Sequence, residues 1–216
     1  KTLRQEIEKL FIDNFNEISS EGYSKISFLH KGNYHNSWDL PKEFVGWDEN
    51  IYLEIKRLKN NLYFREAIIE DCEDIFQWRN NKITRDMSIS SEIVKYNEHV
   101  EWFKSTLNDP HEVCLFFKDQ LVNLKLGIVR FQLDKKMVTG LISINLSPES
   151  RGKNYAKPCL TNAISFLKKN FINCRALYAE IKVDNIPSIK TFEGLDFQLF
   201  EEKKVRDNFL MYKLSI

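Results

Sequence analysis

The sequence has few of the residues that break regular structure. Among its 216 residues only 7 are Gly and 5 are Pro, and it contains no low-complexity tract and no internal repeat. This excludes collagen-like, solenoid and linker-rich chains, and it predicts one packed domain of ordinary size with an appendage. No apolar run approaches the roughly 20 residues that a membrane-spanning helix needs, so we expect no membrane association.

Metal-binding patterns are also missing. The four cysteines are Cys72, Cys114, Cys159 and Cys174; they are far apart and form no CxxC pair, so we expect no zinc or other metal site. Scattered cysteines are typical of free thiols in a reducing compartment, which predicts a cytoplasmic protein. The chain begins at Lys1 without a methionine or a signal-like apolar segment, so we expect it to be cut from a longer polypeptide.

No sign of charge dominates. Lys and Arg together number 32 and Asp and Glu 31, which gives a net charge of +1. This balance argues against broad electrostatic binding to nucleic acid, and we expect no nucleic-acid partner. Apolar residues are plentiful instead, at 43% of the chain with 16 Phe, which is enough to build a large core.

The first 61 residues differ in character from the rest. Apolar residues recur every three or four positions over 1–20, which predicts a helix. Gly, Pro, Asn, His and Ser gather in 21–50 and predict an irregular segment, and 51–58 is expected to form a short helix. We therefore place a boundary at Asn60-Asn61, between an N-terminal helical and irregular extension (1–61) and a second domain (62–216).

The second domain has a mixed pattern of strands and helices. Its predicted order is β-α-α-β-β-β-α-β-α-β-β, which is typical of an α+β sheet protein. A polar stretch, Asn80–Ser91, separates the first two helices. The expected strands are 62–69, 113–118, 121–131, 137–146, 176–183, 197–200 and 209–214.

A compact basic turn joins a strand to a helix in "NLSPESRGKNYAKPCL", residues 145–160. Two interpretations stay open from the residues alone. Backbone N–H groups at the helix start can hold an anion, aided by the helix dipole. The alternative is an ordinary connection with solvated charges. The strand–turn–helix context favours anion binding.

The run "SPESRGKNYAKPCL" followed by "LYAEIKVDNIPSIKTFEGLDF" resembles the GCN5-related N-acetyltransferases (GNAT), over residues 62–216. The signature turn of that family is Arg or Gln, two residues, Gly, one residue, and Gly or Ala. Here it reads Arg151 to Ala156. The resemblance implies a mixed, mostly antiparallel sheet that is split around the cofactor and flanked by helices, with acetyl-CoA as co-substrate and no metal.

Two further stretches narrow the resemblance. "IFQWRN" (75–80) and "YNEHVEWF" (96–103) are similar to the branch that acetylates nucleotide-linked amino sugars in pseudaminic-type and other bacterial surface-glycan pathways. This implies a small-molecule nucleotide-sugar acceptor. The N-terminal "GNYHNSWDLPKEFVGWDENI" resembles the tail of sugar formyltransferases, which implies a fused two-enzyme polypeptide.

The resemblance also implies which residues bind acetyl-CoA. The turn would line the pyrophosphate, the end of the preceding strand would bond the pantetheine arm through its backbone, and an Asn after the next strand would touch the cofactor. These residues are Ile144, Asn145, Leu146, Arg151, Gly152, Lys153, Asn154, Tyr155, Ala156, Lys157 and Asn185.

Three positions depart from the family pattern. Asn154 replaces the signature glycine, but Asn tolerates a positive φ, so the turn can survive. Phe192 stands where members often carry a tyrosine that acts as general acid. Leu141 stands where a carboxylate base is often found. Two usual catalytic groups are therefore missing.

The remaining candidates each have two interpretations. His99 has a side chain whose pKa suits proton transfer near pH 7, or it is a packed core histidine. Glu180 lies on a strand near the expected site, or on a solvated face. Arg79 and Arg85 suit a nucleotide phosphate or ordinary surface pairs, and Met87 suits a sugar methyl or a base face. We expect the acceptor pocket between Asn80–Ser91, the helix of His99 and the open end of the split sheet.

Three functions follow from these features. The first is acetyl transfer from acetyl-CoA to the amino group of a nucleotide-linked sugar, with the sugar, the nucleotide and the oligomeric state left open. The second is acetylation of a protein N-terminus or a small amine by the same fold. The third is a CoA-binding module without catalysis, which the residues Phe192 and Leu141 favour.

Overall fold

The N-terminal part contains a small two-stranded sheet. The computed structural model describes residues 27–30, 33–36, 62–120, 122–200 and 208–216. Strands β1 (Ser27–His30) and β2 (Asn33–Asn36) pair antiparallel. The predicted irregular segment over 21–50 is wrong at these strands, whose Phe and Tyr residues favour extended structure. The helices expected at 1–20 and 51–58 lie outside the described residues.

The rest of the described chain is built on one open sheet with the strand order β3-β4-β5-β6-β7-β9-β8. All neighbouring strands are antiparallel except β6 and β7, which confirms the mixed, mostly antiparallel α+β sheet. The strands are β3 (Leu62–Glu66), β4 (Glu112–Asp119), β5 (Leu124–Leu133), β6 (Thr139–Leu146), β7 (Ala176–Lys182), β8 (Gln198–Leu199) and β9 (Phe209–Ser215).

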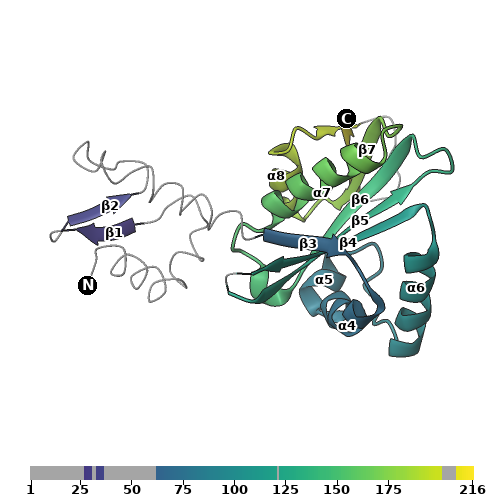
Figure 1. Cartoon of the computed structure of the whole chain (residues 1–216), viewed down its shortest axis with the longest axis horizontal. Helices are drawn as coiled ribbons and strands as arrows, with labels where there is room; N and C mark the ends of the chain where they lie inside the picture. Colours follow the sequence, from purple (N-terminus) through teal and green to yellow (C-terminus); the bar gives the residue numbers. More distant parts are fainter. Residues whose placement is uncertain (1–26, 31–32, 37–61, 121, 201–207) are drawn as a thin grey trace. The chain divides into compact units, whose positions relative to one another are not determined.

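Helices flank this sheet on both faces (Figure 1). They are η2 (Ile69–Asp71), α4 (Cys72–Asn80), α5 (Lys82–Asp86), α6 (Tyr96–Asn108), η3 (Pro148–Ser150), α7 (Ala156–Asn170) and α8 (Ile186–Glu193). The order agrees with the predicted one except for α5, which falls in the polar stretch expected to be a loop. Asn81 starts this helix, because its Oδ1 accepts a hydrogen bond from the Ile83 N–H at 3.1 Å.

The sheet divides between β6 and β7. These parallel strands pair only from Thr139 opposite Ala176 to Leu141 opposite Tyr178. Beyond Leu141, β6 continues to pair with β5, and beyond Tyr178, β7 continues to pair with β9. Each strand thus follows its antiparallel neighbour, and the two halves of the sheet diverge after three residue pairs.

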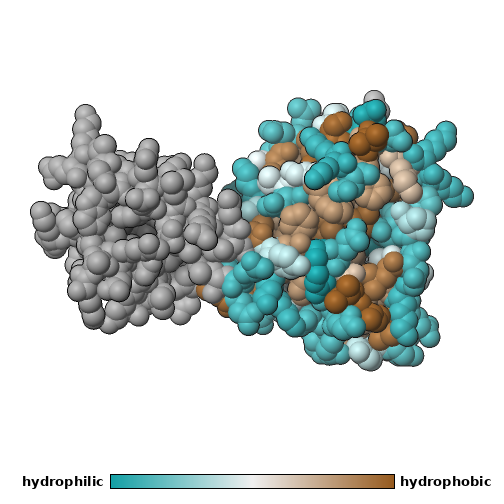
Figure 2. All heavy atoms as spheres, viewed as in Figure 1, coloured by the Kyte–Doolittle hydropathy of each residue, from teal (hydrophilic) through white to brown (hydrophobic). Residues whose placement is uncertain are grey.

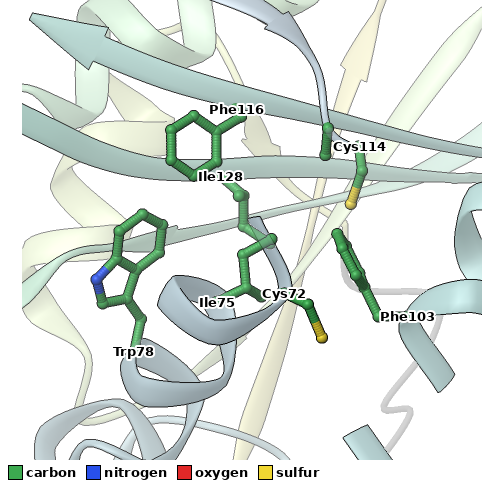
Figure 3. Close-up of a cluster of buried hydrophobic side chains, with 8 residues drawn as sticks. Cys72, Ile75, Trp78, Phe103, Cys114, Phe116 and Ile128 are labelled. Atoms are coloured by element: carbon green, nitrogen blue, oxygen red, sulfur yellow. The ribbon is translucent and has the colours of Figure 1, made fainter. Parts of the chain in front are cut away.

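A core cluster fixes α4 and α6 on one face of the sheet (Figure 3). Ile75 and Trp78 point from α4 toward Phe116 and Ile128 on β4 and β5, and Cys72, Cys114 and Phe103 complete the cluster. Full burial of a side chain such as Phe103, which is 0% exposed, stabilises the fold by roughly 1.5–3 kcal/mol. Helices α7 and α8 cover the opposite face (Figure 1).

The surface is mostly polar. Figure 2 shows hydrophilic residues over much of the visible face of the sheet domain, with apolar residues between them. Among the described residues, none of the helices combines the length and apolar character needed to cross a bilayer.

The turn between β5 and β6 is organised by one carboxylate. Asp134 accepts hydrogen bonds from the backbone N–H groups of Lys136, Val138 and Thr139, at 2.8, 3.1 and 2.8 Å, and from the Thr139 hydroxyl at 2.6 Å. These bonds, that from Thr139 first, lower the pKa of Asp134 to about 2. The turn positions β6 against β5 and thereby the start of the divergence from β7.

We predict that Asp134→Ala lowers the melting temperature at pH 7, because three backbone donors lose their acceptor. The folded pKa lies below the ordinary value, so the contribution is present above about pH 4 and disappears as the pH falls toward 2. Thermal unfolding monitored by circular dichroism at several pH values measures both effects. Lys135→Ala, in the same turn, is the control; equal melting temperatures for Asp134→Ala and the parent at pH 7 contradict the prediction.

Candidate active site

A cavity of about 430 Å³ lies beside the divergence of the sheet. Its walls come from α4, α5, the segment after α5, α6, and strands β5 and β6. It is lined by Ile75, Arg79, Thr84, Ser88, Val94, His99, Trp102, Ile128, Arg130, Ser143, Ile144 and Asn145. The last three residues belong to the part of β6 that no longer pairs with β7. A group held between the diverging strands would therefore have its end near this cavity.

The lining has a definite electrostatic character. It includes two arginines, one histidine, hydroxyl groups and one amide, together with apolar side chains, and it includes no Asp or Glu. Arg130 is neutralised by Glu112, which lies outside the lining and accepts from Nε and Nη2 at 2.8 and 2.7 Å. The cavity thus offers hydrogen-bond donors and positive charge, but no carboxylate that could bind a cationic ligand.

His99 is buried at the cavity wall. Its side chain is 2% exposed and packs against Phe76, Trp102 and Phe103 at ring-centroid distances of 5.4, 5.2 and 6.2 Å. Burial lowers the pKa of His99, and a hydrogen bond to the Cys72 backbone opposes this effect only in part. Its Nε2 has no hydrogen-bond partner among the described residues. His99 is thus a packed histidine, as one interpretation held, and its buried Nε2 makes no hydrogen bond among the described residues.

The motif Trp78-Arg79-Asn80 holds the segment that closes the cavity. Trp78 anchors α4 in the core, stacked on Phe116 at 5.6 Å. Asn80 pairs with the backbone of Val94 twice, accepting from its N–H at 2.9 Å and donating to its carbonyl at 2.8 Å. Arg79 donates from Nη2 to the Ser90 carbonyl at 3.0 Å. Residues 87–95 are therefore tied to the end of α4.

Arg79 has a second feature that bears on binding. Its Nη1 is buried and has no hydrogen-bond partner among the described residues. Burial lowers the pKa of Arg79, with a further contribution from the nearby Arg85, although a guanidinium keeps its charge at neutral pH. The residue expected to meet a phosphate thus lines the cavity with one donor unused.

The two other predicted acceptor contacts do not line the cavity. Arg85 donates from Nε to the Asn80 carbonyl at 3.1 Å and from Nη1 to the Ser91 carbonyl at 2.8 Å, so it holds the same segment as Arg79. Met87 ends α5 and is 37% exposed. The sequence pattern identified Arg85 as a cation near the site but could not show that its donors are used by the backbone.

Glu180 and Asn185 lie elsewhere on the β7 side. Glu180 is half-buried on β7 and is not among the residues that line the cavity. Asn185 caps α8, because its Oδ1 accepts from the Ser188 N–H at 3.3 Å. Glu180 thus lies outside the lining to which His99 belongs, and Asn185 has a capping role.

The basic turn has the backbone of an anion-binding loop. Gly152 and Asn154 have φ values of 72° and 59°, so Asn154 adopts the left-handed conformation for which the family signature uses glycine. Tyr155 is buried and α7 begins at the next residue, Ala156. Lys157 follows this turn, and its amino group lies next to the C-terminal end of α8. A Cβ placed on Gly194, the residue that ends α8, would lie 3.7 Å from the Lys157 Nζ.

Two family positions hold residues without catalytic groups. Phe192 is buried at 3% exposure and packs edge-on against Phe197 at 5.0 Å. Leu141 is 40% exposed and pairs with Tyr178 where the strands diverge. The missing tyrosine and carboxylate are thus replaced by side chains that can only pack.

Several lining residues escaped the sequence interpretation. Ser143 and Asn145 alternate on β6, and Thr84 donates to the Asn145 Oδ1 at 3.2 Å. Arg130 is a charge inside the apolar strand "LGIVRFQL", and that isolated charge was a signal that could have identified it.

One family model matches more than half of the chain. A family model described as an acetyltransferase (GNAT) domain matches residues 61–198. An uncharacterized protein of Methanocaldococcus jannaschii is 27% identical over 161 residues, which cover 73% of this chain and 32% of that protein. The chain thus spans about a third of the length of the curated relative that it matches.

Solved structures share the fold. A domain from Methanocaldococcus jannaschii is 25% identical, with a TM-score of 0.61 and coverage of 72% of this chain and 98% of that one. The spermidine N-acetyltransferase from Vibrio cholerae, in complex with CoA and spermine, is 17% identical, with a TM-score of 0.63 and coverage of 72% and 95%.

We predict that His99 makes the fold acid-sensitive. Its pKa is lowered in the folded state, while an unfolded histidine takes up a proton near pH 6.5. The unfolded state therefore binds more protons as the pH falls below about 6.5, and stability decreases. His99→Gln should show a smaller loss of melting temperature between pH 7 and pH 5 than the parent. His111→Gln, at a half-buried position outside the cavity where the ring nitrogen Nδ1 lies 3.1 Å from Asp109 Oδ1, gives the effect of removing a different imidazole. A loss in His99→Gln as large as in the parent contradicts the prediction.

Proposed function

The chain belongs to the GNAT acetyltransferase family, and from this premise we propose that it transfers the acetyl group of acetyl-CoA to the amino group of a nucleotide-linked amino sugar. Acetyl transfer is the chemistry of the family. The acceptor is the part that needs argument from this chain's own residues. The pathway would be bacterial surface-glycan biosynthesis, as "IFQWRN" and "YNEHVEWF" suggest.

The observation that carries the acceptor proposal is the charge of the cavity. A polyamine carries several positive charges and needs carboxylates around it, whereas this lining has arginines, a histidine and hydroxyl groups. An amino sugar with hydroxyl groups and an attached diphosphate is complementary to such walls. Arg79 supports this reading, since its buried Nη1 could donate to a phosphate or sugar oxygen.

The alternatives fit the cavity less well. A protein N-terminus or a simple amine would not need the cation of Arg79 and the hydroxyl group of Ser143 that line the cavity. A CoA-binding module without catalysis would explain Phe192 and Leu141. It would not explain why a buried neutral histidine with an available nitrogen lines a cavity beside the diverging strands.

Acetyl-CoA as co-substrate would occupy two features of the chain. Its pyrophosphate would be held by the turn from Arg151 to Lys157, where Gly152 and Asn154 with positive φ orient successive N–H groups. Its pantetheine arm would lie along Ile144 to Leu146, in the gap between β6 and β7. Among the described residues no cluster of His, Cys, Asp and Glu could hold a metal ion, and the proposed chemistry uses none.

The proposed reaction places His99 next to the acceptor amine. The amine nitrogen forms a bond to the acetyl carbon, the carbon–sulfur bond breaks, and one proton leaves the nitrogen. His99 is neutral at pH 7 because burial lowers its pKa, so Nε2 can accept that proton. Phe192 has no proton to give, so the thiolate would be protonated from water. Positioning of the amine supplies much of the remaining rate.

We predict that CoA stabilises the protein and that this stabilisation depends on Asn154. Asn154→Val places a β-branched side chain at a φ of 59° and should weaken CoA binding, whereas Asn154→Gly should preserve it. The rise in melting temperature with CoA concentration measures the affinity of each variant. No rise in the parent protein contradicts the cofactor assignment, and equal rises in all three proteins contradict the role of the turn.

We predict that thiol release from acetyl-CoA is stimulated by a nucleotide-linked amino sugar and not by spermidine. The assay compares UDP-, dTDP- and CDP-linked amino sugars with spermidine. His99→Gln should lower the stimulated rate by roughly 10²-fold or more, because general acid–base groups contribute 10²–10⁴. Glu101→Gln, an exposed position on the same helix, is the control. Stimulation by spermidine alone contradicts the proposed acceptor, and an unchanged rate in His99→Gln contradicts the role of that residue.

A further inference from the structure

Trp102 is much more exposed than the neighbouring residues on the same face of helix α6. Its helix neighbours His99 and Phe103 are 2% and 0% exposed, whereas Trp102 is 38% exposed. It also lines the cavity. A large indole left partly uncovered at a concave site is a surface on which a ligand can pack, since aromatic rings contribute more contact area than any other side chain.

The ring of Trp102 is held in place by its neighbours. The Arg130 guanidinium carbon lies over it at 5.3 Å from the ring centroid, in cation–π geometry. The His99 and Phe103 ring centroids lie 5.2 and 6.0 Å away. These three contacts fix the orientation of the indole. The part of the ring that they leave uncovered lies next to His99.

Arg130 is fixed in turn from strand β4. Glu112 accepts both of its hydrogen bonds, at 2.8 and 2.7 Å, and also accepts from Gln132 Nε2 at 3.0 Å. The register explains this geometry, because Glu112 lies opposite Gln132 and Cys114 lies opposite Arg130. The carboxylate balances the guanidinium charge, so Arg130 serves the indole as a planar support.

We propose that Trp102 binds the sugar ring of the acceptor by stacking, and that Glu112 and Arg130 are positioning residues that hold the indole for it. This rests on the proposed function, which it deepens by assigning the part of the acceptor that is recognised as a ring. A pyranose has a flat apolar C–H face that packs on an indole, whereas its hydroxyl groups can meet Ser143 and the other donors of the cavity. A ring stacked on Trp102 lies beside His99, where an amino substituent can reach Nε2.

Steady-state kinetics with the best amino-sugar nucleotide of the panel test this proposal. Trp102→Leu should raise the acceptor KM about tenfold or more, and Trp102→Phe should raise it less. The CoA-dependent rise in melting temperature should stay as in the parent, which shows that each variant is folded. Because Trp102 is partly exposed, its replacement leaves the buried core of α6 intact.

Glu112→Gln tests the positioning role. Gln cannot accept both guanidinium hydrogen bonds, so Arg130 loses its fixed orientation and the KM should rise several-fold with Trp102 present. In the double variant Glu112→Gln, Trp102→Leu the effects should not add, because Glu112 acts through the indole. If the KM of the double variant rises by the product of the two single-variant increases, Glu112 has a role separate from Trp102, and the positioning assignment is overturned.

The outcomes separate this inference from the proposed function. If the parent acetylates an amino-sugar nucleotide and Trp102→Leu has an unchanged acceptor KM, the stacking assignment is overturned and the function stands. If the parent acetylates no amino-sugar nucleotide, the proposed function fails, and the assignment of a sugar to Trp102 fails with it.

Discussion

The short parallel pairing between β6 and β7 is the constraint on which the site depends. Two antiparallel ladders, β5–β6 on one side and β7–β9 on the other, are each continuous, and only three residue pairs join them. A parallel pair is slightly weaker per residue than an antiparallel one, so the junction is where such a sheet opens at least cost. Beyond Leu141 and Tyr178 the two strands no longer pair with each other. The cavity lined by Arg79 and His99 lies beside this opening.

The helices that form the cavity are also anchored in the core. Trp78, Ile75 and Phe103 anchor α4 and α6 on β4 and β5, and the side chains next to them in sequence, Arg79 and Trp102, face the cavity. The same short motifs therefore serve both the core and the site. His99 and Arg79 lie together in this setting, and burial lowers the pKa of both side chains.

Much of the fold could be predicted from the sequence because periodic patterns report it directly. The strands from Glu112 to Leu146 alternate or run apolar, α6 and α7 carry clear helical stripes, and the residues around Arg151 to Ala156 are typical of a turn with positive φ. The short helix α5 was missed because its five polar and mixed residues carry no apolar period, and its start depends on one capping side chain, Asn81.

The site could be predicted only in part, because its geometry depends on register and on side-chain partners. The sequence indicated that Arg79 and His99 lie near the acceptor, and both line the cavity. It could not show that the donors of Arg85 are used by backbone carbonyls, or that Glu112 pairs with Arg130 diagonally across β4 and β5. Those facts arise from tertiary contacts that no local pattern encodes.

The way in which residues 87–95 are held has a consequence for how this cavity can change. Arg79, Asn80 and Arg85 grip the segment through its main-chain atoms at Ser90, Ser91 and Val94, and none of the bonds involves a side chain of the segment itself. These bonds from Arg79, Asn80 and Arg85 do not depend on the side chains at positions 90, 91 and 94, although the Ser88 hydroxyl also donates to the Thr84 carbonyl at 2.6 Å. Side chains there can be exchanged in evolution, or in the laboratory, to reshape one wall for a different amine while the scaffold that fastens it stays the same. The side chains that line this wall can therefore change while the main-chain hydrogen bonds that hold the segment are kept.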